Sequence, residues 1–232
     1  MRLLCFSDIH GNTEAVQLLI KDVRARRAHY DAAIIAGDLT NFSVTHDLPE
    51  SQRSLDNVLW MLTDEFDNVR YVYGNRDFDG RGKKRRSLTH YEGLLLQPGK
   101  KYYLGPKMPI TTSQELADRN TILVQHSNVV SEDSYRRRSV VCRKALLHIT
   151  GHTHTGVLSG NYLNTGFIYR DDSNGAEPMM GGYFDVHITK RRIKTAFHPI
   201  GPIRRRTLNC SGFNGFMYSP HGYAFPVQLA VR

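Results

Sequence analysis

Cysteine is scarce in this chain, and long apolar runs are missing from it. The three cysteines, Cys5, Cys142 and Cys210, are odd in number and far apart, which argues against a disulfide framework and for a reducing compartment. The opening stretch MRLLCFSDIH has too few consecutive apolar residues for the core of a signal peptide, and no other run approaches the length that crosses a membrane. These absences predict a cytoplasmic protein with no membrane partner.

The size and composition are those of an ordinary soluble globular protein. The chain has 232 residues, of which 40% are hydrophobic and 23% are charged. That length favours one large domain, which we expect to occupy residues 1–200. The segment 201–232 is too rich in Phe and Tyr for a solvated tail. We expect it to pack on the body of the protein or on a partner, and the sequence leaves a homo-oligomer open.

Acidic residues are nearly missing from three basic segments. Residues 81–107, 136–144 and 190–206 hold 20 of the 31 Lys and Arg residues but a single acid, Glu92. Such segments on a chain of net charge +9 are typical of proteins with an anionic substrate or partner, nucleic acid included. The alternative is that they are solvated loops and helix faces, because basic runs without a fold context are weak evidence.

Strand and helix patterns alternate along the first half of the chain. Apolar runs predict strands over residues 2–7, 32–36, 69–73, 121–125 and 147–150. Helical spacing of apolar residues predicts helices over 13–28, with Asn12 as N-cap, over 54–66 and around 138–147. Residues 40–50 and 78–100 have the composition of loops, and from residue 156 the pattern indicates antiparallel strands. This alternation predicts an α/β layered fold with largely parallel strands.

Polar side chains follow the ends of five predicted strands. The motifs are FSDIHGN, IIAGDLT, VYGNRD, ILVQHS and ITGHTHTG. In an open α/β sheet, loops at the carboxyl ends of strands converge on one crevice, where ligands bind. Asp8 with His10, and His152 with His154, are i,i+2 pairs, whose side chains we expect to point the same way in extended chain.

Each motif alone has an ordinary structural explanation as a cap, a turn or a core histidine, but together, in this order, they favour a metal site. The seven candidate ligands are Asp8, His10, Asp38, Asn75, His126, His152 and His154. This set of nitrogen and oxygen ligands suits Mn, Fe, Zn, Ni or Mg better than copper, and manganese is our first expectation. Seven ligands exceed what one ion takes while keeping an open position, so we expect two divalent ions. One carboxylate would then bridge them at a separation of ~3.5–4 Å.

The blocks D-x-H, G-D, G-N-x-[D/E], H and G-H-x-H, in this order, resemble the motifs of the calcineurin-like metallophosphoesterase superfamily, over residues 1 to about 200. The compact chain is similar to the small prokaryotic phosphodiesterase branch of that family. The resemblance implies two packed mixed β-sheets flanked by helices, as a four-layer α/β/β/α sandwich. It further implies that Asp38 bridges the two ions. The first ion would take Asp8, His10 and His154, and the second would take Asn75, His126 and His152. Asn164 and Gly166 resemble the Asn-Pro-Gly turn of many members, although proline is absent here.

Arg76 departs from the family pattern, in which many members have a histidine after the metal-binding asparagine. That histidine is thought to protonate the leaving group or to bind the phosphate. Arginine cannot act as an acid, because its pKa exceeds ~12, but it can bind phosphate oxygens and stabilise developing charge. The alternative is a structural ion pair with Asp77 or Asp79.

We therefore expect Asn75 and Arg76 to be catalytic, and Arg76 and His46 to bind the substrate. Without an acid at position 76, activated leaving groups and phosphoanhydrides should react best, unless His46 or His90 supplies the proton.

The resulting expectation is a hydrolase of phosphate esters, a phosphodiesterase or phosphatase acting on a small phosphorylated substrate. A hydroxide bridging the two metal ions would be its nucleophile. One alternative is a nuclease-type phosphodiesterase, which the basic segments 81–86 and 136–138 would favour. Another is a catalytically weak metal-binding scaffold, as a few family members are adaptors. The presence of all seven ligands argues against a scaffold, which has no need of them.

Overall fold

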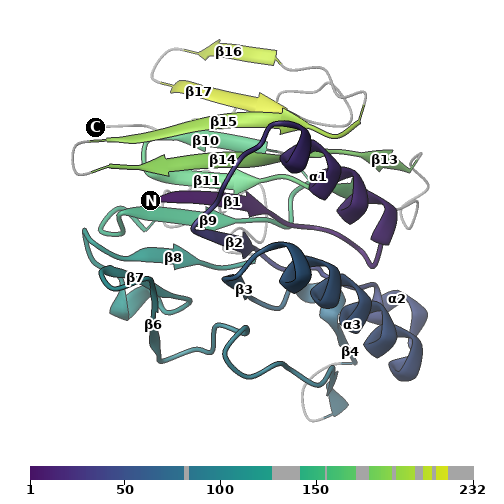
Figure 1. Ribbon diagram of the computed structural model, residues 1–232. Helices are drawn as coiled ribbons and strands as arrows, with labels where there is room; N and C mark the ends of the chain where they lie inside the picture. The colour runs from purple at the N-terminus through teal and green to yellow at the C-terminus, as the bar shows by residue number, and fades with distance from the viewer. Residues whose placement is uncertain are drawn as a thin grey trace.

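The computed structural model describes residues 1–80, 84–126, 142–154, 156–170, 178–189, 192–201, 206–210 and 213–218. Two mixed β-sheets pack face to face at its centre, and the two longest helices cover the outer face of one of them (Figure 1). The expected α/β class, with two packed mixed sheets and flanking helices, is confirmed. None of the helices in the described part of the chain has both the length and the apolar character that crossing a membrane requires.

The first sheet has five strands in the order β15-β14-β1-β2-β3. They are β1 (Arg2–Phe6), β2 (Ala32–Ile35), β3 (Val69–Tyr71), β14 (Gly182–Ile188) and β15 (Ile193–Pro199). The strands β1, β2 and β3 run parallel, whereas β14 pairs antiparallel with both β1 and β15. The parallel strands bring the segments after Phe6, Ile35 and Tyr71 to the same edge of the sheet.

The second sheet has eight strands in the order β16-β17-β10-β11-β9-β8-β7-β6. They are β6 (Lys101–Leu104), β7 (Met108–Thr111), β8 (Ile122–Val124), β9 (Leu147–Thr150), β10 (Gly156–Ser159), β11 (Tyr162–Thr165), β16 (Arg206–Cys210) and β17 (Phe213–Tyr218). The strands β7, β8, β9 and β11 run parallel, and β10 and β11 form the expected antiparallel pair. At the far edge, β17 pairs with β10 and β16 pairs with β17, so residues 206–210 and 213–218 extend this sheet.

The core has two layers, and side chains of β1 alternate between them. Leu4 and Phe6 belong to the cluster under the helices, whereas Leu3 and Cys5 belong to the cluster between the sheets. All four are completely buried, because both faces of this strand are covered, which explains its continuous apolar run. Burying each such side chain stabilises the fold by about 1.5–3 kcal/mol. Cys5 packs as a small hydrophobe in the cluster between the sheets.

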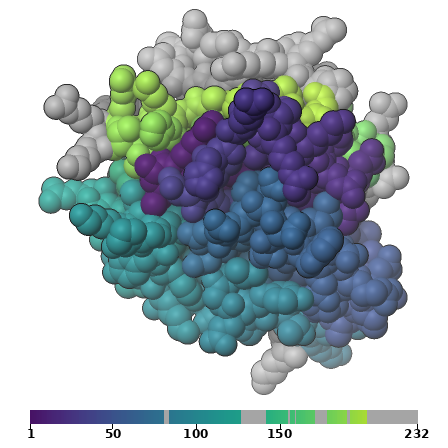
Figure 2. Space-filling model, viewed as in Figure 1, coloured from purple at the N-terminus to yellow at the C-terminus, as the bar shows by residue number. Residues whose placement is uncertain are grey.

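The two longest helices are α1 (Thr13–Ala25) and α3 (Leu48–Glu65). They lie side by side and form part of the face of the molecule seen in Figure 2. The side chain of Asn12 accepts a hydrogen bond from the amide of Ala15 at 2.7 Å, as its predicted role as N-cap requires. The helix α3 begins six residues before the predicted start at residue 54. Its own N-cap, Asp47, accepts a hydrogen bond from the amide of Glu50, and proline occupies the first turn.

Short elements surround these layers. They are α2 (Phe42–Thr45), the 3₁₀ helices η1 (Asn75–Asp77) and η3 (Gln114–Leu116), the hairpin of β4 (Phe78–Asp79) with β5 (Arg86–Ser87), and the hairpin of β12 (Tyr169–Arg170) with β13 (Met179–Met180). The predicted helix around 138–147 is wrong where it can be compared: residues 142–146 form turns, and Leu147 begins β9. The side-chain amide of Asn161 donates to the carbonyls of Cys142 and Ala145, which fixes these turns. Residues 138–141 lie outside the described chain.

Candidate metal centre

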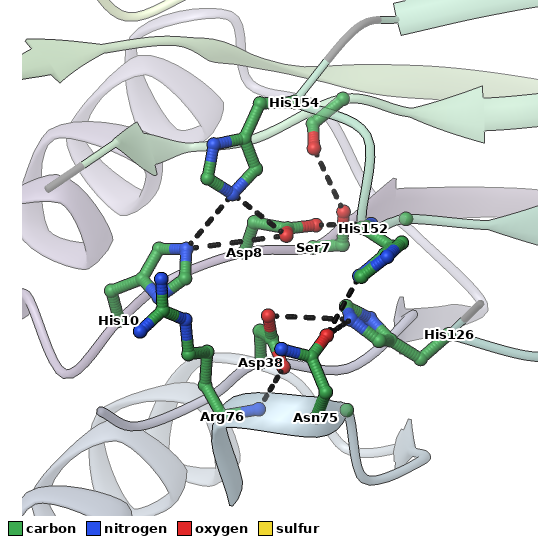
Figure 3. A network of polar contacts seen from close by, with 12 residues as sticks. Ser7, Asp8, His10, Asp38, Asn75, Arg76, His126, His152 and His154 are labelled. Carbon is green, nitrogen blue, oxygen red and sulfur yellow. Dashed lines mark hydrogen bonds and ion pairs between the residues drawn. The ribbon is translucent and has the colours of Figure 1, made fainter. Parts of the chain in front are cut away.

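The ends of five parallel strands bring all seven candidate ligands to one place (Figure 3). From the first sheet, Asp8 and His10 follow β1, Asp38 follows β2 and Asn75 follows β3. From the second sheet, His126 follows β8, and the pair His152 and His154 follows β9. The site therefore spans the interface between the two sheets at their carboxyl ends, where the sequence pattern placed it.

Asp8, His10 and His154 form the first group. Their ligand atoms all lie within 4.8 Å of one another. Nε2 of His154 is 3.1 Å from Oδ1 of Asp8 and 3.1 Å from Nε2 of His10. Asp8 and His10 are buried, whereas His154 is half-buried and reaches the surface. The three atoms thus converge on one point from different directions, as the ligands of a single ion do.

Asp38, His126 and His152 form the second group, again with ligand atoms within 4.8 Å of one another. Nε2 of His126 lies 3.2 Å from Oδ2 of Asp38. Asn75 joins this group, since its Oδ1 is 3.0 Å from Nε2 of His126 and 2.7 Å from Nδ1 of His152. The structure therefore gathers the candidate ligands in two groups, with Asp38 in the second, and a bridging role of Asp38 stays a prediction.

Each aspartate has one oxygen bound to the backbone and one directed at the imidazoles. Oδ2 of Asp8 accepts a hydrogen bond of 3.0 Å from the amide of His152, and Oδ1 of Asp38 accepts one of 2.8 Å from the amide of Arg76. The remaining oxygens, Oδ1 of Asp8 and Oδ2 of Asp38, face the histidines. Oδ1 of Asp8 is buried and receives no hydrogen bond from the described residues. A buried carboxylate oxygen in this state is costly unless a cation is bound to it.

Two of the histidines are oriented by a hydrogen bond that their Nδ1 makes, away from the ligand group. Nδ1 of His126 lies 2.8 Å from the carbonyl oxygen of Ala36, which can only accept, so Nδ1 carries the proton. Nδ1 of His10 lies 2.9 Å from Oδ1 of Asn41 and donates to it in the same way. In the neutral ring, Nε2 then presents a lone pair to the group of ligands. This is how imidazoles are held when they bind metals.

The backbone at the candidate ligands is strained. Among the described non-glycine residues, seven have a positive φ, and five of these are candidate ligands: Asp8 at 55°, His10 at 53°, Asp38 at 53°, His152 at 76° and His154 at 50°. Such conformations cost on the order of 1–3 kcal/mol each and gather at functional sites. They also correct our expectation for His152 and His154, whose side chains enter different groups. The i,i+2 rule assumed extended backbone, which neither residue has.

Glycines in the motifs give the ligands room. A Cβ atom on Gly74 would lie 2.0 Å from Oδ1 of Asp38, and one on Gly151 would lie 2.7 Å from Oδ2 of Asp8. Any side chain at these two positions would displace a candidate ligand. An aspartate that follows another strand approaches each of these glycines closely, which explains Gly74 in the G-N motif and Gly151 in the G-H-x-H motif.

The charges within the site shift its pKa values in opposite directions. Burial alone would lower the pKa of His126, but the nearby Asp38 carboxylate raises it to about 9. Burial opposes ionisation of Asp8, yet the imidazoles of His154, His126 and His10 hold the pKa of this carboxyl well below its usual range. Burial, with the neighbouring charge of His126, lowers the pKa of His152. The site therefore holds ionised carboxylates beside imidazoles, a donor set that fits divalent cations.

Arg76 lies in η1, directly beside Asn75 and half-buried. Figure 3 shows its side chain rising from η1 on the side of the ligand groups. The two acids that we considered as structural partners have other partners. Asp77 is completely buried and accepts hydrogen bonds from the amides of Gly74, Leu39 and Thr40. Asp79 is bound to His46 and Arg86.

The other candidates from the basic and loop segments lie at the surface. His46 is exposed and bound to Asp79, and His90 is exposed. Of the segment 81–86, the guanidinium of Arg85 stacks over the ring of Phe78, 3.3 Å from its centroid, and Arg86 pairs with Asp79. Residues 81–83 and 136–138 lie outside the described chain, so nucleic-acid binding through these segments stays a prediction.

Sequence reasoning missed several residues that support the ligands. Asn41 orients His10, the carbonyl of Ala36 orients His126, and Asp77 ties Gly74, before η1, to the segment after β2. Asn164, which was named only through the family resemblance, donates from its side chain to the carbonyl of Gly151 at 2.9 Å and so holds the histidine loop. The available signal was a polar residue within a few positions of a ligand, which is too common to identify such roles from sequence.

One family of known proteins matches most of the chain in sequence. A family model described as a calcineurin-like phosphoesterase superfamily domain matches residues 1–170. No curated protein matches the chain in sequence. Among solved structures, the phosphoesterase Yfce from E. coli is similar at 18% identity and a TM-score of 0.45, over 84% of this chain and 98% of that one.

Two other solved structures are comparably similar. A metallophosphoesterase from Sphaerobacter thermophilus has 16% identity and a TM-score of 0.43, over 86% of this chain and 88% of that one. Vps29 complexed with Zn²⁺ from Entamoeba histolytica has 16% identity and a TM-score of 0.41, over 86% of this chain and 99% of that one. Structural similarity at these identities and TM-scores does not indicate the ligands or the activity of this chain.

Proposed function

The chain belongs to the calcineurin-like phosphoesterase superfamily, and from this premise we propose that it hydrolyses phosphate esters with two divalent cations bound at the ends of β1, β2, β3, β8 and β9. Asp8, His10 and His154 would hold one ion. Asn75, His126 and His152 would hold the other, and Asp38 would contribute to both. Manganese remains the first candidate, since the donor set consists of imidazole nitrogen and carboxylate or amide oxygen.

One observation carries this proposal: in the first group, atoms that can accept a hydrogen bond or bind a metal lie against one another. Oδ1 of Asp8 lies 3.1 Å from Nε2 of His154, and that nitrogen lies 3.1 Å from Nε2 of His10. Nδ1 of His10 carries the proton that goes to Asn41, so its Nε2 is an acceptor when the ring is neutral. Protons or metal ions must compensate this buried set of acceptors. Two imidazoles and one carboxylate per group are what a catalytic divalent cation takes from protein.

Two bound cations would supply an activated water as nucleophile and would neutralise charge on the phosphoryl oxygens. The protein's own residues set the geometry. The backbone amides of His152 and Arg76 hold the two aspartates, and Asn41 and the carbonyl of Ala36 fix the imidazole tautomers. Arg76 is positioned beside Asn75 to bind a non-bridging phosphate oxygen, where a planar guanidinium can make two parallel hydrogen bonds.

The substrate class that these residues favour is a small phosphodiester or phosphoanhydride. A fixed positive charge at position 76 stabilises the extra negative charge of the transition state but gives no proton to the leaving group. Esters whose leaving groups are stable anions should therefore react fastest.

The direct test is hydrolysis of bis(p-nitrophenyl) phosphate by metal-stripped protein, before and after addition of Mn²⁺. We expect no turnover without metal, and turnover that follows metal addition. The variant Asp8→Asn should lose this activity, while the matched control Asp67→Asn should retain it. Asp67 is exposed and precedes β3, at the opposite end of the strand from Asn75. Turnover that survives complete metal removal, or that is lost equally in the control, would contradict the proposal.

A further inference from the structure

His46, Asp79 and Arg86 form a closed polar ring outside the ligand groups. Nδ1 of His46 lies 2.7 Å from Oδ1 of Asp79. Oδ2 of Asp79 accepts from both Nε and Nη2 of Arg86, with Nε at 3.0 Å. Nη2 of Arg86 also donates to the backbone carbonyl of His46 at 3.0 Å. One arginine therefore holds the carboxylate and the backbone of the histidine at once.

This arrangement fixes one tautomer and leaves one nitrogen available. A carboxylate can only accept, so Nδ1 of His46 carries the proton that faces Asp79. Nε2 makes no hydrogen bond with the described residues, and the side chain is 65% exposed, whereas that of Asp79 is 12% exposed. A half-enclosed carboxylate that orients an exposed imidazole is the arrangement by which proteins prepare a histidine for proton transfer.

The backbone of His46 is strained as well. Its φ is +55°, in the left-handed region, at the C-cap of α2. Glycine or asparagine is the usual residue in this conformation, because larger side chains cost about 1 kcal/mol or more there. Outside the candidate metal ligands, Arg27 is the other described non-glycine residue with a positive φ. Strain at an oriented, exposed histidine is a second, independent indication of function.

The ring is linked to the proposed reaction centre through α2 and η1. Asn41, directly before α2, orients the candidate ligand His10, and α2 packs against both η1 and β4. The 3₁₀ helix η1 carries Asn75 and Arg76. A helix of four residues advances only about 6 Å, so His46 is one short helix away from the metal centre. A leaving group attached to a phosphate at that centre spans such a distance.

We propose that His46, oriented by Asp79, is the general acid that protonates the leaving group, in place of the acid that Arg76 cannot be. This inference rests on the proposed function and adds the residue that extends its substrates to alkyl phosphodiesters. As water adds to phosphorus and the bond from phosphorus to the leaving oxygen breaks, Nε2 of protonated His46 gives its proton to that oxygen. The products are the alcohol and the phosphomonoester. Neutral His46 then regains a proton from solvent, which balances the proton that the attacking water releases.

Among the described residues, the charged groups that contact His46 are Asp79 from β4 and Arg86 from β5. Asp47 follows His46 in the chain, and its carboxylate is bound to the amide of Glu50. The guanidinium of Arg86 also lies over the ring of Phe42 in α2. Because an acid must be protonated to act, the rate with an alkyl ester should fall toward alkaline pH, whereas the rate with an aryl ester should lack this fall.

The test compares bis(p-nitrophenyl) phosphate with glycerophosphoethanolamine in the Mn²⁺-loaded parent and in His46→Asn. Asparagine tolerates the left-handed backbone and can still donate to Asp79, so this variant keeps the loop conformation. We expect kcat/KM for the alkyl diester to fall about 100-fold or more, and that for the aryl diester to change less than about threefold. The alkaline fall of the rate with the alkyl ester should disappear in the variant.

Two further variants make the test specific. Asp79→Asn keeps the imidazole but removes the charge that orients it. We expect kcat/KM for the alkyl diester to fall in this variant, less than in His46→Asn, and kcat/KM for the aryl diester to stay close to that of the parent. His90→Asn removes another exposed histidine of the same region and should match the parent on both substrates.

Equal losses on both substrates in His46→Asn, or a selective loss in His90→Asn, would overturn the assignment of His46. The aryl reaction needs no acid. Its absence in the parent would therefore overturn the proposed function itself, and the role of His46 with it.

Discussion

The carbonyl oxygen of Ala36, at the end of β2, accepts a hydrogen bond of 2.8 Å from Nδ1 of His126, which follows β8. The first sheet thereby orients a candidate ligand that the second sheet supplies. With Nδ1 committed to this bond, Nε2 of His126 faces Asp38 at 3.2 Å and Asn75 at 3.0 Å. The packing of the two sheets, and not any one motif, sets the geometry of the second ligand group.

Metal binding should release a proton from His126 at neutral pH. Burial would lower the pKa of this residue, but Asp38 raises it to about 9, so in the metal-free protein the ring is protonated at pH 7 and neutral well above pH 9. A metal ion at Nε2 must displace that proton. Titration calorimetry with Mn²⁺ in buffers of different ionisation enthalpy should show about one proton more released at pH 7 than at pH 10. Equal proton release at both pH values would contradict the assignment of His126 as a ligand.

Asp38→Asn should abolish activity and weaken the binding of both ions, because a shared ligand loses its charge toward each. The substitution keeps an oxygen for the amide of Arg76, so the fold should survive. We expect kcat/KM to fall by more than the 10–100-fold typical of residues that only support a ligand. Metal analysis after dialysis checks the binding, with Asp67→Asn as the matched control. Two tightly held ions in Asp38→Asn would exclude the shared role.

His154→Ala and His152→Ala should empty different positions. His154 contacts Asp8 and His10, whereas His152 contacts Asn75, so each variant should retain the ion of the other group. Metal analysis should find close to one ion per chain in either variant, bound with different affinities. Loss of both ions from either variant to the same degree would leave the division into two groups unsupported.

Arg76→Ala should slow the hydrolysis of every phosphate ester through loss of charge stabilisation, by about 100-fold or more if the guanidinium contacts the transferring phosphoryl group. Arg76→His should recover part of the rate and should favour poor leaving groups, because it introduces a proton donor. The measurement is kcat/KM over a series of leaving groups in the three proteins. If kcat/KM of Arg76→Ala equals that of the parent for every leaving group, the arginine has a structural role, and only Asn75 of this motif takes part in the reaction.

The ligand motifs were predictable because each is local: an apolar strand followed at once by Asp, Asn or His. The parallel order of β1, β2 and β3 then brings them together without further information. The start of α3 was missed, although Asp47 and the proline of its first turn are N-terminal signals, because the polar composition of residues 40–50 is also that of a loop.

Features that depend on contacts between distant segments could not be predicted. The divergence of His152 and His154 follows from left-handed backbone at both residues, which periodicity does not reveal. The turns over residues 142–146 depend on the side chain of Asn161, from the turn between β10 and β11. The pairing of Asp79 with His46 and Arg86, in place of Arg76, joins α2 to the hairpin of β4 and β5, which are separated in the sequence by α3 and β3.

We propose that this site holds two cations and that phosphoester hydrolysis needs both of them. The most direct measurement titrates Mn²⁺ into metal-stripped protein and follows both bound metal and turnover of bis(p-nitrophenyl) phosphate. We expect two bound ions per chain and a rate of hydrolysis that reaches its plateau only when the second equivalent of Mn²⁺ has been added. A plateau at one equivalent, or two bound ions with no turnover, would contradict the proposal.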